Sequence, residues 1–140
     1  MKFRRWITLA VAMLMLVVAP CTAFAVGYEE SEIIPKYSSA LQVNANLHID
    51  SGGTATCKGT VTLKNATSDV SIVVALYKKD GSSWRKVTSW SQSSSGRVRL
   101  EFVKTKTVTH GTYKVVLTGT VTTANGDTER ISDTSGQITY

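Results

Sequence analysis

The stretch Leu41-Gln42-Val43-Asn44-Ala45-Asn46-Leu47-His48-Ile49-Asp50 alternates apolar and polar residues without a break. An alternation of period two predicts a strand with one buried face. The turn Ser51-Gly52-Gly53 follows, and a second alternating stretch from Thr54 to Lys64 carries Cys57 on its apolar side. Two such stretches joined by a short glycine turn are typical of an antiparallel hairpin.

The rest of the chain repeats this pattern, with turn residues about every 8–12 positions. Further strands are expected over residues 70–77, 84–91, 97–104, 113–122 and 128–131, with residues 138–140 as an extension. The first of these is apolar on both parities, which predicts a strand buried on both sides. Asn125-Gly126 predicts a hairpin turn, because both residues tolerate a positive φ. We therefore predict an all-β domain of seven or eight antiparallel strands, a β-sandwich or a small barrel.

The first 25 residues have a different character. Lys2, Arg4 and Arg5 precede an apolar run, and the run ends near the small-residue triplet Ala23-Phe24-Ala25. This is the pattern of a helical secretory signal peptide, cleaved here after Ala25. We accordingly expect a signal peptide over residues 1–25, an acidic flexible segment over 26–39 and the β domain over 40–140. The predicted location is extracellular, without an integral membrane anchor, because no later apolar run approaches the ~20 residues that span a bilayer.

The predicted mature chain of 115 residues has 13 basic and 10 acidic residues. It contains 32 Ser and Thr residues, a composition that suits half-exposed strands and turns. Cys57 is its single cysteine, so no internal disulfide can form. This size and composition exclude a multidomain enzyme, a disulfide-stapled miniprotein and a multi-pass membrane protein.

The segment Gly111-Thr112-Tyr113-Lys114-Val115 resembles the start of strand F in immunoglobulin-like domains, where a Gly-x-Tyr-x-Cys pattern places a corner tyrosine. The resemblance implies that Tyr113 is this tyrosine and that Val115 stands in place of the second cysteine. Cys57 would then be a core thiol facing Val115. The strand-C tryptophan is also missing, and a residue near Leu76 takes its place.

About residues 40–140 also resemble an uncharacterised family of small secreted proteins from anaerobic Gram-positive bacteria. The shared features are the leader, the Ser51–Cys57 segment, the Leu76-Tyr77-Lys78-Lys79 segment with the two following tryptophans, and Gly111-Thr112-Tyr113. The resemblance implies an immunoglobulin-like β-sandwich. It implies no activity, so no catalytic residue is transferred.

Groups for catalysis or metal binding are few. A thiol-based site would need Cys57 to be exposed beside His48 or His110, against its apolar parity. Asp127, Glu129 and Asp133 cluster near the last hairpin and could serve as an acid–base pair or as oxygen ligands for Ca²⁺, although a solvated turn has the same composition. We expect no catalytic residues, no metal site and no cofactor.

Two features favour a binding surface. Trp84 and Trp90 share one parity, with Lys86 and Thr88 between them, and could stack on sugars or anchor a partner. Eight basic and two acidic residues lie between positions 78 and 106, which could attract an anionic polymer, although a solvated strand face has the same pattern. The candidate contact residues are Tyr77, Lys79, Trp84, Arg85, Lys86, Trp90, Arg97 and Arg99.

The sequence thus favours a secreted, non-enzymatic binding or cell-surface interaction module. Its partner would be a cell-wall polymer, a glycan or a surface protein rather than nucleic acid, which a secreted protein rarely meets. The alternatives are a small secreted hydrolase that uses Cys57 or His110, and a released effector or inhibitor that acts on other cells.

Overall fold

The computed structural model describes residues 36–140, so the predicted signal peptide and residues 26–35 lie outside the described residues. The alternating stretches form strands, and the all-β prediction is confirmed. The strands are β1 (Ala40–Ile49), β2 (Thr54–Leu63), β3 (Asp69–Asp80), β4 (Ser83–Ser94), β5 (Arg99–Thr107), β6 (Thr112–Thr122), β7 (Thr128–Thr134) and β8 (Ile138–Thr139).

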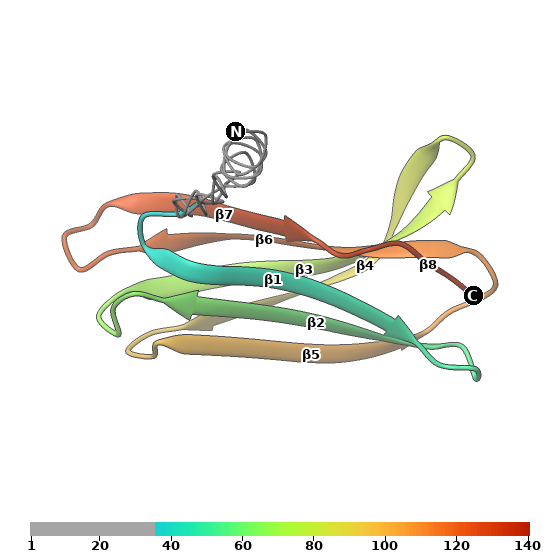
Figure 1. Cartoon of the computed structure of the whole chain (residues 1–140), viewed down its shortest axis with the longest axis horizontal. Helices are drawn as coiled ribbons and strands as arrows, with labels where there is room; N and C mark the ends of the chain where they lie inside the picture. The colour runs from blue at the N-terminus through green and yellow to red at the C-terminus, as the bar shows by residue number, and fades with distance from the viewer. Residues whose placement is uncertain (1–35) are drawn as a thin grey trace, which may run out of the picture. The chain divides into compact units, whose positions relative to one another are not determined.

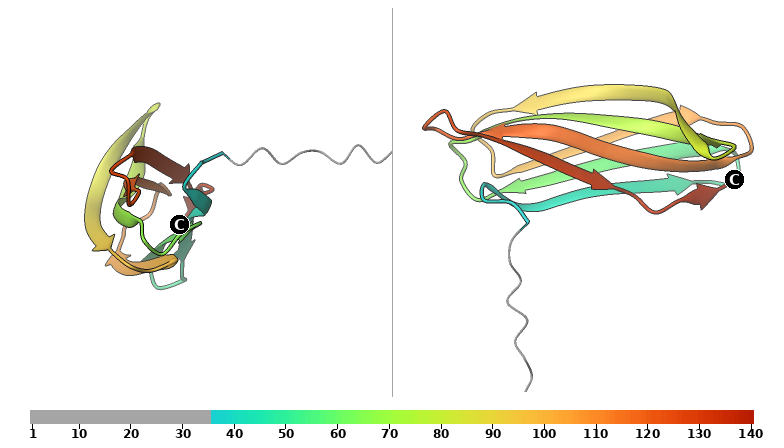
Figure 2. Two further views of the ribbon diagram at one scale, coloured as in Figure 1. Left: turned by 90° about the vertical axis from the view of Figure 1, so that its left-hand side faces the viewer. Right: turned by 90° about the horizontal axis from the view of Figure 1, so that it is seen from above.

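The strands form two antiparallel sheets in the arrangement of a β-sandwich (Figure 1). One sheet has the order β1-β2-β5, and the other has the order β4-β3-β6-β7, with β8 also paired to β6. Seen end-on in Figure 2, β7 lies beside β1 on one side of the two layers, and β4 lies nearest β5 on the other.

The core lies between the sheets and is built from the apolar side chains that alternate along the strands. Its fully buried side chains include Cys57, Val61, Leu63, Ile72, Val74, Leu76, Tyr113, Val115, Leu117, Val121 and Ile131. The other sheet packs directly against Gly59 of β2, where an added Cβ atom would lie 2.9 Å from both Leu117 Cδ1 and Val74 Cγ2. A side chain at this position would push the sheets apart.

Two register shifts move side chains from the face that simple alternation predicts. In β1 the pairing shifts between Ala40 and Gln42, and Leu41 is 64% exposed rather than buried. In β4 the pairing passes from Leu76 opposite Thr88 to Tyr77 opposite Lys86, so Val87 is an extra residue. An extra residue inverts the faces of every side chain beyond it.

The prediction that β3 is buried on both sides is wrong. Ile72, Val74 and Leu76 face the core, but Val73 on the opposite face is 37% exposed. Within residues 36–140 no element covers this outer face, and only Ala75 is buried there. Val98 is likewise exposed, because it precedes β5 in the loop.

Connections between strands use glycine where the backbone requires it. The β6–β7 loop closes with Gly126 N donating to Thr123 O (2.9 Å) and Thr123 N donating to Asp127 O (2.9 Å). Gly126 has a φ of 87°, whereas Asn125 does not adopt a positive φ. The predicted hairpin is therefore present, but its connection is longer than a two-residue turn.

Carboxylates close the β1–β7 side of the sandwich. Glu129 accepts hydrogen bonds from the backbone N–H groups of Ser38 (2.7 Å) and Ser39 (2.8 Å), and Asp133 accepts one from Ala45 N–H (2.7 Å). Tyr37 Oη also donates to Ser132 O (2.6 Å). Two members of the acidic cluster noted in the sequence, Glu129 and Asp133, therefore satisfy backbone donors of β1 and of the two residues that precede it.

We expect Gly59→Val to destabilise the protein by about 1–3 kcal/mol, because the new side chain must displace Leu117 and Val74. Gly136→Val is the matched control, since no atom lies within 4 Å of a Cβ atom at Gly136. Its effect should stay within about 0.5 kcal/mol. Urea denaturation measures both, and equal losses in the two variants would contradict the close approach of the sheets.

The Glu129 contacts predict an acid-sensitive component of stability. Partial desolvation raises the pKa of the Glu129 carboxyl group, but the hydrogen bonds from Ser38 and Ser39 outweigh it and lower the pKa overall. A pKa that is lower in the folded state stabilises the fold above the ordinary glutamate pKa, and this contribution is lost as the pH falls through the folded value.

Glu129→Gln should therefore cost about 1 kcal/mol at pH 7 and reduce the loss of stability between about pH 5 and pH 3. Asp127→Asn in the neighbouring loop makes the same charge change and serves as the control. Urea denaturation at a series of pH values is the measurement. An unchanged pH profile for Glu129→Gln would show that these hydrogen bonds do not stabilise the fold.

Candidate functional site

The candidate site lies on the hairpin formed by the far ends of β3 and β4. This hairpin turns at Gly81, whose φ is 62°, and bends away from the two layers at the upper right of Figure 1. Its pairs are Tyr77 with Lys86, Lys78 with Arg85, and Lys79 with Trp84. We call this segment, Tyr77–Lys86, the basic hairpin.

The bulge at Val87 separates the two tryptophans that the sequence predicts on one face. Trp90 lies opposite Val74, so it faces inward, and its ring centroid is 6.4 Å from that of Phe102 on β5. Trp84 lies beyond the bulge opposite the exposed Lys79 and faces outward. The expectation of a two-tryptophan platform is therefore wrong, because the extra residue inverts the parity.

Three lysines lie around two aromatic rings on the outward face of the basic hairpin. The lysines are Lys79, Lys86 and Lys114, and the rings are those of Tyr77 and Trp84. Lys86 and Lys114 flank Tyr77 on the neighbouring strands β4 and β6. Lys114 Nζ lies 4.3 Å from the centroid of the Trp84 ring, a cation–π contact that covers one face of the indole. Lys114 was not among the predicted contact residues, because only the pairing of β6 with β3 brings it here.

Lys78 has a structural role on the inward face of the same hairpin. Its Nζ atom donates to Thr109 Oγ1 (2.9 Å) and lies 5.5 Å from the centroid of the Tyr113 ring. Tyr113 Oη in turn donates to the carbonyl oxygen of Thr109 (2.7 Å). These contacts join the base of the hairpin to the β5–β6 loop.

Arg97 and Arg99 do not join the basic hairpin. Ser94 at the end of β4 pairs with Val70 at the start of β3, so the β4–β5 loop that carries Arg97 lies about 35 Å from the hairpin tip. Arg99 is on β5 in the other sheet, where its Nη2 atom is 3.3 Å from Glu101 Oε2. The basic cluster read from the sequence is therefore divided between two ends of the molecule.

Two cations of the three-stranded sheet share one carboxylate, that of Glu101. On the three-stranded sheet, Lys58 Nζ lies 2.7 Å from Glu101 Oε1, and hydrogen bonds and charge from Lys58, then Arg99, lower the pKa of Glu101. Within residues 36–140 the ion pairs are these two on Glu101, so Lys79, Lys86 and Lys114 have no carboxylate partner.

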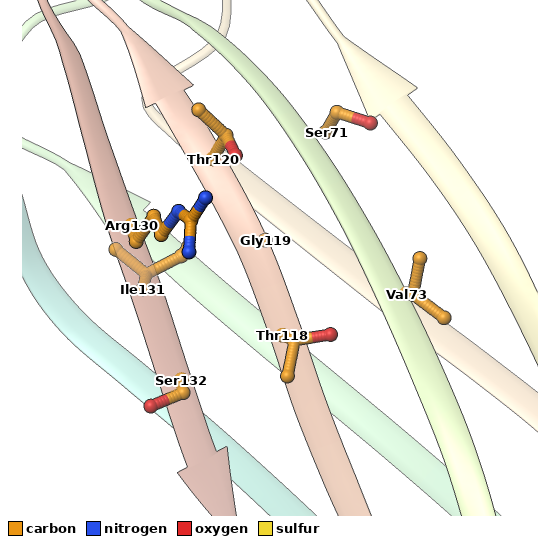
Figure 3. A pocket seen from close by; sticks show the side chains of 8 residues that line it. All are labelled: Ser71, Val73, Thr118, Gly119, Thr120, Arg130, Ile131 and Ser132. Atoms are coloured by element: carbon orange, nitrogen blue, oxygen red, sulfur yellow. The ribbon is translucent and has the colours of Figure 1, made fainter.

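A shallow depression of about 570 Å³ lies on the same outer face of the five-stranded sheet. Figure 3 shows Arg130 of β7 beside it, and its lining is completed by Ser71, Val73, Thr118, Gly119, Thr120, Ile131 and Ser132. The lining contains no carboxylate, histidine or cysteine, so it offers no general base. Hydroxyl groups and one guanidinium group can bind a polar or anionic ligand.

The two groups considered for catalysis lie in different surroundings. Cys57 is fully buried, and burial raises the pKa of its thiol to about 11. The exposed His110 stacks on Tyr140 with ring centroids 4.6 Å apart. Among the described residues, no three His, Cys, Asp or Glu side chains are grouped in a way that could hold a metal ion.

In comparisons with known proteins, no family model and no curated protein matches the chain. Over residues 36–140, no helix is both long enough and apolar enough to cross a membrane.

Cys57 should be inert toward thiol reagents in the native protein. Because the thiol is buried and its pKa is about 11, we expect negligible labelling by iodoacetamide at pH 8 without denaturant and rapid labelling in denaturing urea. Mass spectrometry of the alkylated protein measures both rates. Rapid labelling of the native protein would instead support the hypothesis of a thiol-based hydrolase.

Proposed function

We propose that this chain is a secreted, non-enzymatic, immunoglobulin-like β-sandwich that binds an extended acidic polymer through the basic hairpin. An acidic glycan or an anionic cell-wall polymer is the chemistry that this surface fits. The predicted signal peptide would deliver the domain to where such polymers occur. A relation to small secreted proteins of anaerobic Gram-positive bacteria stays a prediction from the sequence.

The order of the strands supports the immunoglobulin-like assignment. In that fold strands A, B and E share one sheet, and C, F and G share the other. With β1, β2 and β5 as A, B and E, and β3, β6 and β7 as C, F and G, the two sheets here have the same division. The strand β4 then extends the C edge, as an additional strand does in variable-type domains.

The tyrosine at the start of β6 supports the same assignment. A tyrosine corner has a hydroxyl group bonded to the backbone a few residues upstream, and Tyr113 Oη donates to Thr109 O. Cys57 on β2 and Val115 on β6 are both fully buried in the core. They occupy the strands that carry the inter-sheet disulfide in antibody domains, with packing in place of the covalent bond.

The single observation that carries the binding proposal is the uncompensated charge of the basic hairpin. Lys79, Lys86 and Lys114 lie together on one exposed face without a carboxylate partner in the described part of the chain, whereas Lys58 and Arg99 on the other sheet share Glu101. Trp84 holds Lys114 in place through the cation–π contact. The site is therefore mainly electrostatic, and one face of the indole is already covered.

An extended ligand fits the placement of a fourth cation. Arg130 pairs with Thr120, which pairs with Ser71, so Arg130 faces the same side of the sheet as Tyr77. Ser71 is six residues before Tyr77 on β3, a distance of about 20 Å along the strand. A polymer that runs along this face would meet the basic hairpin first and then the hydroxyl-lined depression beside Arg130.

Binding should depend on the basic hairpin and on ionic strength. We expect polygalacturonate, an acidic glycan, to bind the purified protein at low salt and neutral dextran not to bind. Lys79→Gln with Lys86→Gln should weaken polygalacturonate binding by about tenfold, because two unpaired cations are lost. Raising the salt to about 1 M should abolish it, since the Debye length falls to about 3 Å. Isothermal titration calorimetry measures each affinity.

The matched control removes two positive charges from the opposite end. Arg97→Gln with Arg99→Gln changes the net charge equally, and we expect less than a twofold effect on binding. Equal weakening by the two double variants would show attraction to net charge alone. Binding that is insensitive to salt would also refute the proposed site.

A further inference from the structure

Three of the four sheet edges in the described part of the chain are protected against pairing with another strand. The edge of β1 is occupied where Asp133 accepts the hydrogen bond of Ala45 N–H. The β7 edge carries charges at three of its seven positions: Glu129, Arg130 and Asp133. The third edge, β5, carries charges at four of its nine positions: Arg99, Glu101, Lys104 and Lys106. Charged side chains of this kind deter edge-to-edge pairing.

The fourth edge, β4, is protected over only half of its length. Arg85, Lys86 and the bulge at Val87 guard the half nearest the hairpin tip. The other half, Thr88–Ser94, contains no charge and no proline. Within residues 36–140 β4 pairs only with β3, so the outward backbone groups of Thr88–Ser94 have no strand partner. A neutral free edge of seven residues is long enough for a typical strand pairing.

We propose that this edge, Thr88–Ser94, pairs antiparallel with the same edge of a second copy of the chain. A two-fold axis at Ser91 would place Ser91 opposite Ser91 and Ser89 opposite Ser93 of the other copy. The two five-stranded sheets would join into one continuous sheet. Such a contact is isologous, so it closes after two copies.

Charge favours a second copy in this orientation. In the antiparallel pair the two basic hairpins point to opposite ends, and the two Arg85 residues lie twelve strand positions apart, about 40 Å. This exceeds the Debye length of about 10 Å at 0.1 M salt, so their repulsion is screened. A parallel arrangement would set the basic hairpins side by side. The edge itself carries no charge with which to select a foreign acidic peptide.

Trp90 gives the contact an apolar component. Its side chain is only half-buried, packed against the core at the open side between β4 and β5. In the proposed register Trp90 lies opposite Gln92 of the other copy, so the two Trp90 side chains are diagonal neighbours within reach of each other. Pairing would thus remove exposed indole surface from water in both copies. The interface remains small, so the dimer is weak and concentration-dependent.

Sedimentation equilibrium of the purified protein over a range of concentrations tests the dimer. We expect a reversible monomer–dimer equilibrium that Ser89→Lys with Ser93→Lys weakens at least tenfold, because two opposed lysine pairs would form. Ser89→Glu with Ser93→Glu should have the same effect. A mixture of the lysine and glutamate variants should recover association, since each opposed pair is then a salt bridge. Such recovery would exclude damage to the fold as the cause of the weaker association in each variant.

The control places the same charges on the outer face of a central strand. Thr118→Lys with Thr122→Lys on β6 should leave the dimer unchanged. A protein that sediments as a monomer at every concentration overturns the proposal, whether or not its β4 edge binds extended peptides. Equal weakening by the β6 variant, or no recovery on mixing, also overturns it.

Cross-linking tests the register. Antiparallel partners have Cα atoms about 4.5–5.5 Å apart, which a disulfide can bridge. Because Cys57 is buried, Ser91→Cys introduces the one accessible thiol of residues 36–140. Glutathione disulfide should then give a covalent dimer of Ser91→Cys but not of Thr118→Cys. Similar cross-linking of both variants would refute the proposed register. Lys79→Gln with Lys86→Gln should still dimerise, which separates this inference from the polymer-binding site.

Discussion

Hydrogen bonds from backbone N–H groups to two carboxylates determine which sides of this sandwich are closed. Glu129 and Asp133 extend from β7 to the N–H groups of Ser38, Ser39 and Ala45, and so connect the two sheets along the β1–β7 side. Within residues 36–140 the opposite side, between β4 and β5, has no comparable link, and there the Trp90 and Phe102 rings pack against each other. This asymmetry leaves β4 as an accessible strand and lets the basic hairpin project beyond the core.

The sequence predicts the strands well because each has a buried face with period two. It fails where one residue changes the register. Val87 inverts the parity between Trp84 and Trp90, and the shift after Ala40 exposes Leu41 in the same way. A bulge is set by pairing with another strand rather than by local composition, so alternation within β4 alone contains no signal for it. The strands themselves and most core residues were therefore predictable, but several strand ends lie two or three residues from the expected positions, and the face of the candidate site was not predicted.

The candidate site shows the same limit for charge. Nearness in sequence grouped Arg97 and Arg99 with the basic hairpin, although antiparallel pairing sends them to the other end of the molecule. Lys114 is separated from Trp84 by thirty positions in the sequence, and the pairing of β3 with both β4 and β6 brings them together. The acidic cluster also differs from the metal or acid–base site considered from the sequence, since Glu129 and Asp133 accept hydrogen bonds from backbone N–H groups.

The two proposed surfaces reinforce each other without sharing residues. A dimer formed through Thr88–Ser94 would present two basic hairpins at opposite ends of one continuous sheet. Each basic hairpin alone offers a few exposed lysines, and such contacts are individually weak. Two of them on a rigid frame can engage one polymer at once, so the second contact forms at a high effective concentration. Weak dimerisation is then sufficient, because a polymer that binds both basic hairpins would itself stabilise the dimer.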